Sequence, residues 1–138
     1  MKTKVFIDGK EGTTGLKIFE RLPKREDIRI LLIDEDKRKD LNERKRLINE
    51  SDITFLCLPD AAAIEAVSFV ENPDTRTIDA STAHRTNPAW DYGFPELSPR
   101  HRENIAKSKR VANPGCYATG FISCVYPLVQ AGVLPEDY

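Results

Sequence analysis

The sequence predicts an α/β fold of the Rossmann-like, doubly wound type, in which a mainly parallel sheet carries helices on both faces. Short apolar segments rich in β-branched residues alternate with segments of helical periodicity, and this alternation builds βαβ units with parallel strands. A glycine-rich segment, residues 9–15, follows the first apolar segment, where dinucleotide-binding folds place their phosphate-binding turn. A chain of 138 residues suits one domain of about 100–150 residues, so we expect a single dinucleotide-binding domain over residues 1–138.

The expected strands are short apolar segments that end at polar or turn-forming residues, and they span residues 5–7, 28–33, 53–58, 77–79 and 110–112. Segment 28–33 is apolar at all but one position, so we expect it to be buried on both faces of the sheet. Segment 53–58 has the same character and is expected to be a second buried strand.

The segments between these strands have helical periodicity or composition, and they span residues 16–22, 38–50, 61–70, a stretch opening at 98–99, and 117–129. Pro23 ends the first of them, and Asp60 suits the N-cap of the third. Ser98 and Pro99 form a serine cap followed by proline at the first helical position. Pro127 is expected to kink the last helix.

Composition and charge exclude several classes of protein. Lysine and arginine total 21 and aspartate and glutamate total 22, so the net charge of -1 gives no overall reason to expect nucleic-acid binding. No apolar run approaches the roughly 18 residues of a membrane span, and the first residues lack the apolar core of a signal peptide. The three cysteines form no CxxC pair, so we expect no disulfide framework, no metal site and a cytoplasmic location.

The first motif with chemical meaning is DGKEGTTG, residues 8–15, between the first expected strand and the first expected helix. Glycines permit a tight turn and let backbone N–H groups approach a phosphate, while a helix N-terminus adds a partial positive charge. Gly9, Gly12 and Gly15 are spaced as GxxGxxG, which differs from the commoner GxGxxG. The position after the first strand favours a phosphate-binding turn.

The end of the second expected strand bears on the choice of dinucleotide. Asp34 lies about 20–25 positions beyond the glycines, where an acidic residue accepts hydrogen bonds from the adenosine ribose, and this favours NAD. Lys37, Arg38 and Lys39 follow directly and suit the 2′-phosphate of NADP. The residues alone therefore leave the choice open.

The segment ANPGCYATG, residues 112–120, places Cys116 between the end of a strand and the start of an amphipathic helix. Unpaired N–H groups and the helix dipole stabilise a thiolate there, and the same N–H groups can stabilise a developing oxyanion. Gly115 leaves room for an incoming acyl group. Cys57, in an apolar strand, and Cys124, farther along the helix, are expected to be structural. We therefore expect Cys116 to be a nucleophile.

The segment DASTAHR, residues 79–85, opens an aperiodic stretch that runs to residue 97, and a loop this long usually carries function. The small hydroxyl residues Ser81 and Thr82 suit the lining of a cofactor site. Arg85 suits a phosphate or a carboxylate, which a guanidinium binds with two parallel hydrogen bonds. His84 is a candidate general base for Cys116.

Taken together and in this order, these motifs resemble the N-acetyl-gamma-glutamyl-phosphate reductases of arginine biosynthesis, with the shorter bacterial type the closer match. The segments that carry the resemblance extend over essentially the whole chain, and they are DGKEGTTG at 8–15, FLCLPDAAA at 55–63, DASTAHR at 79–85, YGFPEL at 92–97 and ANPGCYATG at 112–120. Aspartate-semialdehyde dehydrogenases share the layout and the chemistry but differ in the cysteine segment.

The resemblance implies an NADPH-dependent reduction of an acyl phosphate to an aldehyde, with phosphate release, through a thioester on Cys116. A covalent intermediate of this kind divides a difficult reaction into two easier steps. The implied cofactor-binding residues are Gly9, Glu11, Gly12, Thr13, Thr14, Gly15, Asp34, Leu58, Pro59, Ser81 and Thr82. The implied substrate-binding residues are Arg85, Asn113 and Gly115.

The resemblance also implies a longer protein. Family members are about twice this length, and their second, α+β domain supplies a catalytic histidine and much of the contact in a homo-oligomer. His84 and His101 do not occupy that histidine's position. We therefore expect this chain to be an N-terminal fragment that binds dinucleotide weakly and does not turn over alone.

Several alternatives remain open from the sequence. A stand-alone dinucleotide-binding module would need the glycine turn but no activated cysteine. A cysteine hydrolase that uses Cys116 with His84 and Asp79 would not need the glycine turn. A sister reductase acting on another acyl phosphate, of the aspartate-semialdehyde or lysine-pathway type, would keep both features.

Overall fold

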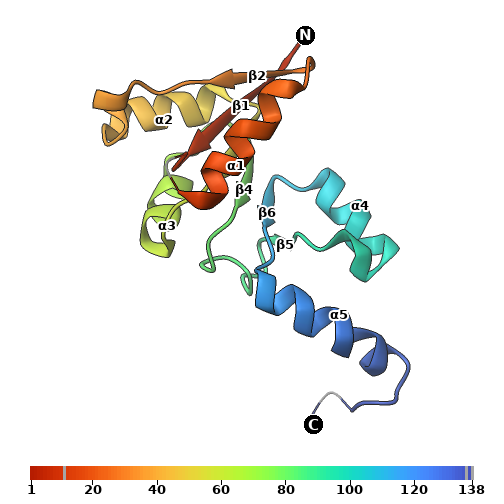
Figure 1. Ribbon diagram of the computed structural model, residues 1–138. Coiled ribbons are helices and arrows are strands. Elements are labelled where there is room, and N and C mark those ends of the chain that lie inside the picture. Colours follow the sequence, from red (N-terminus) through yellow and green to blue (C-terminus); the bar gives the residue numbers. More distant parts are fainter. Residues whose placement is uncertain (11, 136, 138) are drawn as a thin grey trace.

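The computed structural model, which describes residues 1–10, 12–135 and 137, contains one sheet in which every adjacent pair of strands runs parallel (Figure 1). The strand order is β2-β1-β3-β4-β6-β5. The strands are β1 (Thr3–Asp8), β2 (Ile28–Leu31), β3 (Ile53–Leu56), β4 (Arg76–Asp79), β5 (Asp91–Tyr92) and β6 (Arg110–Ala112). The predicted doubly wound α/β class is therefore confirmed.

Helices lie in every connection between successive strands except the loop from β4 to β5. The α-helices are α1 (Thr13–Arg21), α2 (Leu41–Glu50), α3 (Asp60–Ser68), α4 (Pro99–Lys107) and α5 (Cys116–Gln130), and the short 3-10 helices are η1 (Leu22–Lys24), η2 (Glu35–Lys37) and η3 (Pro95–Leu97). Ser98 caps α4 as predicted, and its side chain accepts a hydrogen bond from the backbone N–H of His101. Pro23 lies in η1, directly after α1, as expected of a residue that ends a helix.

Three sequence expectations need correction. The strand expected at 28–33 ends at Leu31 and lies at an edge of the sheet, so Leu32 is 63% exposed rather than buried. Asp60 is the first residue of α3 and not its N-cap, because its carboxylate turns to the loop after β4 and accepts hydrogen bonds from Thr82. The helix expected from residue 38 begins at Leu41, because the side chain of Asp40 caps it.

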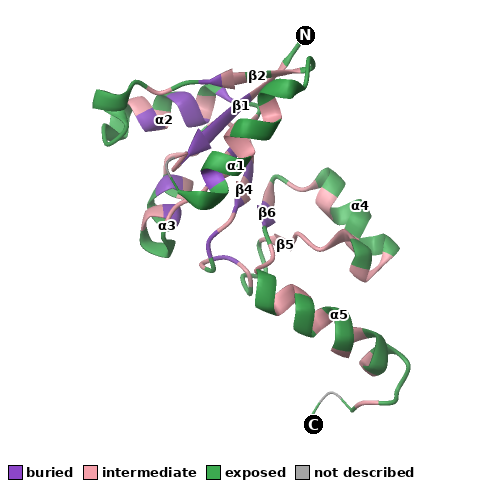
Figure 2. Ribbon diagram, in the orientation of Figure 1, coloured by how far each residue is buried: buried purple, intermediate pink, exposed green. Residues whose placement is uncertain are grey.

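A hydrophobic core cluster lies on one face of the sheet, where α2 and α3 pack against β1, β2 and β3. Apolar side chains from both layers form it, and they are Phe6, Leu31, Leu47, Ile48, Leu56, Ala63 and Ala66. In Figure 1, α1 crosses in front of the sheet whereas α2 lies behind it, so helices cover both faces. Burial is concentrated around β1 and its neighbours (Figure 2).

Helix α5 differs from the other elements because it extends away from the sheet (Figures 1 and 2). None of its residues is buried, and Tyr117 is 91% and Phe121 is 68% exposed. Pro127 lies inside this helix, whose span is continuous from Cys116 to Gln130. Among the described residues, no helix is long and apolar enough to cross a bilayer.

Candidate active site

The glycine turn at the end of β1 is fixed by contact with the end of β3. Gly9 has a φ of +87°, and a Cβ built there would lie 2.3 Å from the carbonyl oxygen of Cys57. A Cβ on Gly15 would lie 2.3 Å from the carbonyl oxygen of Gly9. Both positions therefore require glycine, because a side chain would collide with backbone atoms.

The first turn of α1 presents backbone N–H groups to an open space. Gly12 is the N-cap of α1, and no side chain caps this helix. Gly12, Thr13 and Thr14 line a cavity of about 260 Å³, whose other wall is formed by residues after β3 and β4, namely Cys57, Leu58 and Ala80. A helix N-terminus with uncapped N–H groups at such a cavity fits the pyrophosphate of a dinucleotide.

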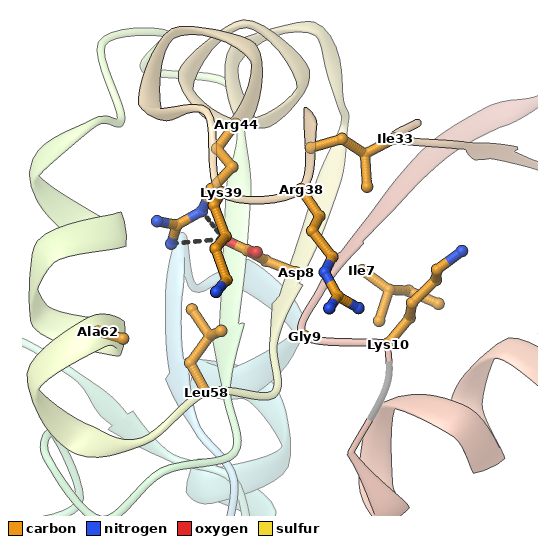
Figure 3. Close-up of a pocket in the computed structure, with 10 residues that line it drawn as sticks. All are labelled: Ile7, Asp8, Gly9, Lys10, Ile33, Arg38, Lys39, Arg44, Leu58 and Ala62. Carbon is orange, nitrogen blue, oxygen red and sulfur yellow. Dashed lines mark hydrogen bonds and ion pairs between the residues drawn. The ribbon is translucent and has the colours of Figure 1, made fainter. Parts of the chain in front are cut away.

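A second cleft, of about 400 Å³, is bordered by Gly9 and Lys10 of the glycine turn and by residues that follow β2 and β3 (Figure 3). Leu58 and Ile33 contribute apolar surface to it, and Lys10, Arg38 and Lys39 bring positive charge. The predicted Asp34 does not line this cleft, and its exposed carboxylate pairs with Lys37 at 3.6 Å. Figure 3 shows the side chains of Arg38 and Lys39 extending towards Gly9 and Leu58, whereas Lys10, which pairs with Glu35 at 3.3 Å, points away from them.

A buried ion pair forms one wall of this cleft (Figure 3). Both Nε and Nη2 of Arg44 donate to Oδ2 of Asp8, at 3.1 and 2.9 Å, and Nη1 donates to Glu65 at 3.3 Å. Burial raises the pKa of Asp8, and the hydrogen bonds from Arg44 oppose that shift. Sequence reasoning missed this pair, although Arg44 precedes the buried Leu47 by one helical turn and so occupies a core-facing position.

Cys116 is the first residue of α5, and its side chain is exposed. The N-cap of α5 is Gly115, which offers no side-chain cap. The guanidinium of Arg85 packs against Gly115, where a Cβ would lie 2.5 Å from Nη1. The predicted cysteine, glycine and arginine therefore meet at one helix N-terminus.

Cys57 has different surroundings, as expected of a structural cysteine. It is half-buried behind the glycine turn, and its N–H donates to the carbonyl of Asp8. Burial raises the pKa of its thiol to about 11, with a further contribution from the charges of Asp8 and Asp79. It is therefore a poor nucleophile near neutral pH.

The loop after β4 is held by two carboxylates. The hydroxyl of Ser81 donates to Asp79 at 2.7 Å, and the hydroxyl of Thr82 donates to Asp60. Both predicted cofactor-binding hydroxyls therefore use their donor within the chain and keep only acceptor capacity for a ligand. His84 also pairs with Asp79, and among the described residues no hydrogen bond joins it to Cys116.

Three more of the predicted site residues, Leu58, Pro59 and Asn113, lie at the same carboxyl edge of the sheet. Leu58 lines both cavities, and Pro59 caps α3 and is exposed. The backbone oxygen of Asn113 accepts a hydrogen bond from Nε of Arg85 at 3.1 Å. Glu11 lies outside the described residues.

Comparison with known proteins identifies the family. The sequence profile described as "Semialdehyde dehydrogenase, NAD binding domain" matches residues 4–107. The chain belongs to this family. The fold, the glycine turn and the two cavities at the sheet edge are those of a nicotinamide-dinucleotide domain.

Curated relatives of this semialdehyde dehydrogenase domain are closer in sequence than the solved structures. The chain is 54% identical over 137 residues to the N-acetyl-gamma-glutamyl-phosphate reductase of Trichormus variabilis. The aligned region covers 99% of this chain and 42% of that protein. It is 58% identical over 134 residues to the enzyme of the same name from Burkholderia orbicola, covering 97% and 43%. These relatives confirm the resemblance carried by the motifs, and the chain spans less than half of their length.

Solved structures support the fold alone. Aspartate semialdehyde dehydrogenase II of Vibrio cholerae superposes with a TM-score of 0.69 at 15% identity, over 95% of this chain and 43% of that one. The Candida albicans enzyme with NADP gives a TM-score of 0.63 at 13% identity, over 96% and 48%.

Proposed function

We propose that this chain is the cofactor-binding and nucleophile-bearing part of an NADPH-dependent reductase. The reaction converts N-acetyl-γ-glutamyl phosphate to N-acetylglutamate 5-semialdehyde and releases phosphate. The observation that carries the proposal is the site at the start of α5, where Cys116 stands exposed beside Gly115 and the guanidinium of Arg85. The names of the curated relatives support the choice of substrate.

Cys116 begins the reaction in this proposal. Its thiolate attacks the acyl carbon, the bond from that carbon to the phosphate oxygen breaks, and a thioester forms on Sγ. Arg85 binds the phosphate during this step, because its guanidinium borders the residue that precedes the nucleophile. The uncapped N–H groups of α5 stabilise the negative charge that develops on the acyl oxygen.

The reduced nicotinamide, when bound, supplies the hydride that reduces the thioester carbon. Cys116 then leaves as a thiolate and frees the aldehyde. Gly115 leaves the space that the guanidinium of Arg85 occupies beside the nucleophile, rather than space for the acyl group, and Asn113 lies on the adjoining loop. By the resemblance, the histidine that exchanges protons at this site comes from the part of the relatives that the chain does not match.

The residues present fit NADPH. Gly12, Thr13 and Thr14 would hold the pyrophosphate at the uncapped start of α1. Arg38 and Lys39 line the second cleft and would pair with the 2′-phosphate, which NADH lacks. The variant Arg38→Gln/Lys39→Gln should weaken NADPH binding by about tenfold or more and leave NADH binding within about twofold, since two ion pairs to phosphate are lost. Equal weakening of both cofactors would contradict this assignment.

The decisive experiment follows the covalent step and the turnover separately. The chain, and the complete product of the gene that encodes it, are incubated with N-acetyl-γ-glutamyl phosphate, and intact mass is measured for an acyl adduct. NADPH oxidation is followed in parallel, with the one-carbon-longer acyl phosphate and aspartyl phosphate as competing substrates. Cys116→Ser should abolish both signals, while Cys124→Ser on the same helix should retain them.

Two results would redirect the proposal. Binding of NADPH with no acyl adduct on any substrate would favour a dinucleotide-binding module without catalysis. Preference for another acyl phosphate would assign the chain to a sister reductase.

A further inference from the structure

The carboxylate of Asp79 organises the start of the loop after β4. Asp79 ends this strand with 0% exposure. Its Oδ1 accepts the backbone N–H of Ser81 at 2.9 Å, and its Oδ2 accepts the Ser81 hydroxyl at 2.7 Å. The same Oδ2 lies 2.6 Å from Nδ1 of His84. A buried carboxylate needs such donors, because an unpaired one is costly to desolvate.

His84 is held from two sides. Besides its contact with Asp79, its ring stacks on the indole of Trp90, with centroids 4.1 Å apart and an angle of 15° between the planes. Its backbone oxygen accepts the N–H of Asn87 at 3.1 Å, and the residue is 6% exposed. The imidazole therefore has a fixed place between the sheet and the far end of the loop.

The next residue along the chain is Arg85, which reaches the nucleophile's helix. Its Nε donates to the backbone oxygen of Asn113 at 3.1 Å, and Nη2 lies 3.4 Å from that of Ala80. Nη1 borders Gly115 closely enough that a Cβ there would lie 2.5 Å away. Among the described residues no carboxylate lies within ion-pair distance of Arg85, although the charge of Asp60 acts on it from farther away. Backbone oxygens of Asn113 and Ala80 hold its guanidinium.

We propose that His84 is a positioning residue, which acts through Arg85 rather than as a base for Cys116. Clamped between Asp79 and Trp90, it sets the loop so that the guanidinium of Arg85 stands beside the start of α5. A positive charge fixed there attracts an anionic reactant to the thiolate. The identity of that reactant as an acyl phosphate rests on the proposed function; the placement of Arg85 by His84 does not.

The test uses two alkylating agents of opposite character on the chain itself. Iodoacetate is anionic and iodoacetamide is neutral. The measured quantity is the rate constant for iodoacetate divided by that for iodoacetamide at Cys116, determined by peptide mass. The ratio reports charge beside Sγ, and a general loss of packing would change both rates together. Arg85→Met sets the value expected without the guanidinium.

His84→Leu should lower the ratio about two- to fivefold, towards the Arg85→Met value, as expected for loss of one partly exposed charge interaction. His84→Asn should give a ratio between those of wild type and His84→Leu, because its amide N–H can take the place of Nδ1–H on Asp79 while the stacking on Trp90 is lost. Trp90→Leu removes the opposite side of the clamp and should also lower the ratio. Trp90→Leu therefore tests the role of the clamp on His84 if His84→Leu does not fold.

The proposal is overturned by an unchanged ratio in folded His84→Leu or Trp90→Leu, or by an equal fall in His84→Asn. A wild-type ratio no higher than that of Arg85→Met also overturns it. The proposed function fails independently, by absence of an acyl adduct on Cys116. A normal adduct with an unchanged alkylation ratio would reject the role of His84 alone.

Discussion

The glycine turn allows stability and cofactor binding to be separated with two substitutions of the same kind. In Gly9→Ala the new side chain must adopt a φ of +87° and would lie 2.3 Å from the carbonyl oxygen of Cys57. The left-handed conformation costs about 1–2 kcal/mol and overpacking about 1–3 kcal/mol more, which gives about 2–5 kcal/mol of lost stability. For a chain of this size that is a fall in Tm of about 6–20 °C.

Gly12→Ala should behave differently. The nearest atom to its Cβ is the carbonyl oxygen of Gly9 at 3.7 Å, which is an ordinary contact. Alanine is a poorer N-cap than glycine, but it also reduces the entropy of the unfolded chain, so stability should change by less than about 1 kcal/mol. The methyl group would, however, project from the residue that lines the cavity at the start of α1. NADPH binding should therefore weaken about tenfold or more.

Urea unfolding followed by the fluorescence of Trp90, the one tryptophan, measures stability, and calorimetric titration with NADPH measures binding. The expected pattern is a stability loss confined to Gly9→Ala and a binding loss in a fully folded Gly12→Ala. Equal destabilisation by both variants would show that the turn is not fixed by the Cys57 carbonyl. Wild-type affinity in Gly12→Ala would remove the pyrophosphate from the start of α1.

The structure makes three further predictions. At pH 8 iodoacetamide should modify Cys116 at least tenfold faster than Cys57, because the thiolate of Cys57 forms only as pH rises through about 11. Peptide mass measures both rates, and faster modification of Cys57 would contradict the prediction. Arg44→Met should lower the free energy of unfolding by about 3–5 kcal/mol, because the buried Asp8 carboxylate loses its partner. The double variant Asp8→Asn/Arg44→Met should recover most of that loss. Additive losses from the two substitutions in urea unfolding would argue against the pair. Hydrogen bonds from Thr82 lower the pKa of Asp60 in the folded state. The stability that this carboxylate contributes is therefore present above its unfolded pKa and is lost as pH falls through the lower folded value. Asp60→Asn should make stability fall less steeply at acid pH, and an unchanged acid dependence would refute this.

Local patterns in the sequence were sufficient to predict much of this fold. The glycine turn and the strand β6 before Cys116 lie where expected, because their signals are contained in a few consecutive residues. The apolarity of residues 28–33 did not reveal that β2 is an edge strand, since position within a sheet depends on the whole topology. The two-residue strand β5 has no periodic signal at all, so it could not be separated from the loop around it.

The candidate site divides in the same way. Cys116 and the glycines carry local motifs, so the sequence alone predicts them as candidate site residues. The pairing of Asp8 with Arg44 joins residues 36 positions apart, and the contact of Arg85 with Gly115 joins two different loops, so neither has a local signal. Such contacts depend on how parallel strands bring their carboxyl ends to one edge.

That edge is held together mainly by backbone hydrogen bonds that continue the sheet beyond its strands. The N–H of Cys57 donates to the carbonyl of Asp8 at 2.8 Å, Ala80 to Leu56 at 2.9 Å, and Asn113 to Asp79 at 2.8 Å. The glycine turn and the nucleophile's loop are therefore spaced by the sheet itself, which substitutions of side chains change little. Arg85 differs, because the proposed clamp on His84 adds a side-chain contribution to the backbone oxygens of Asn113 and Ala80 that hold it. Mutations that alter selectivity for the reactant without loss of fold should consequently concentrate in that loop rather than around Cys116.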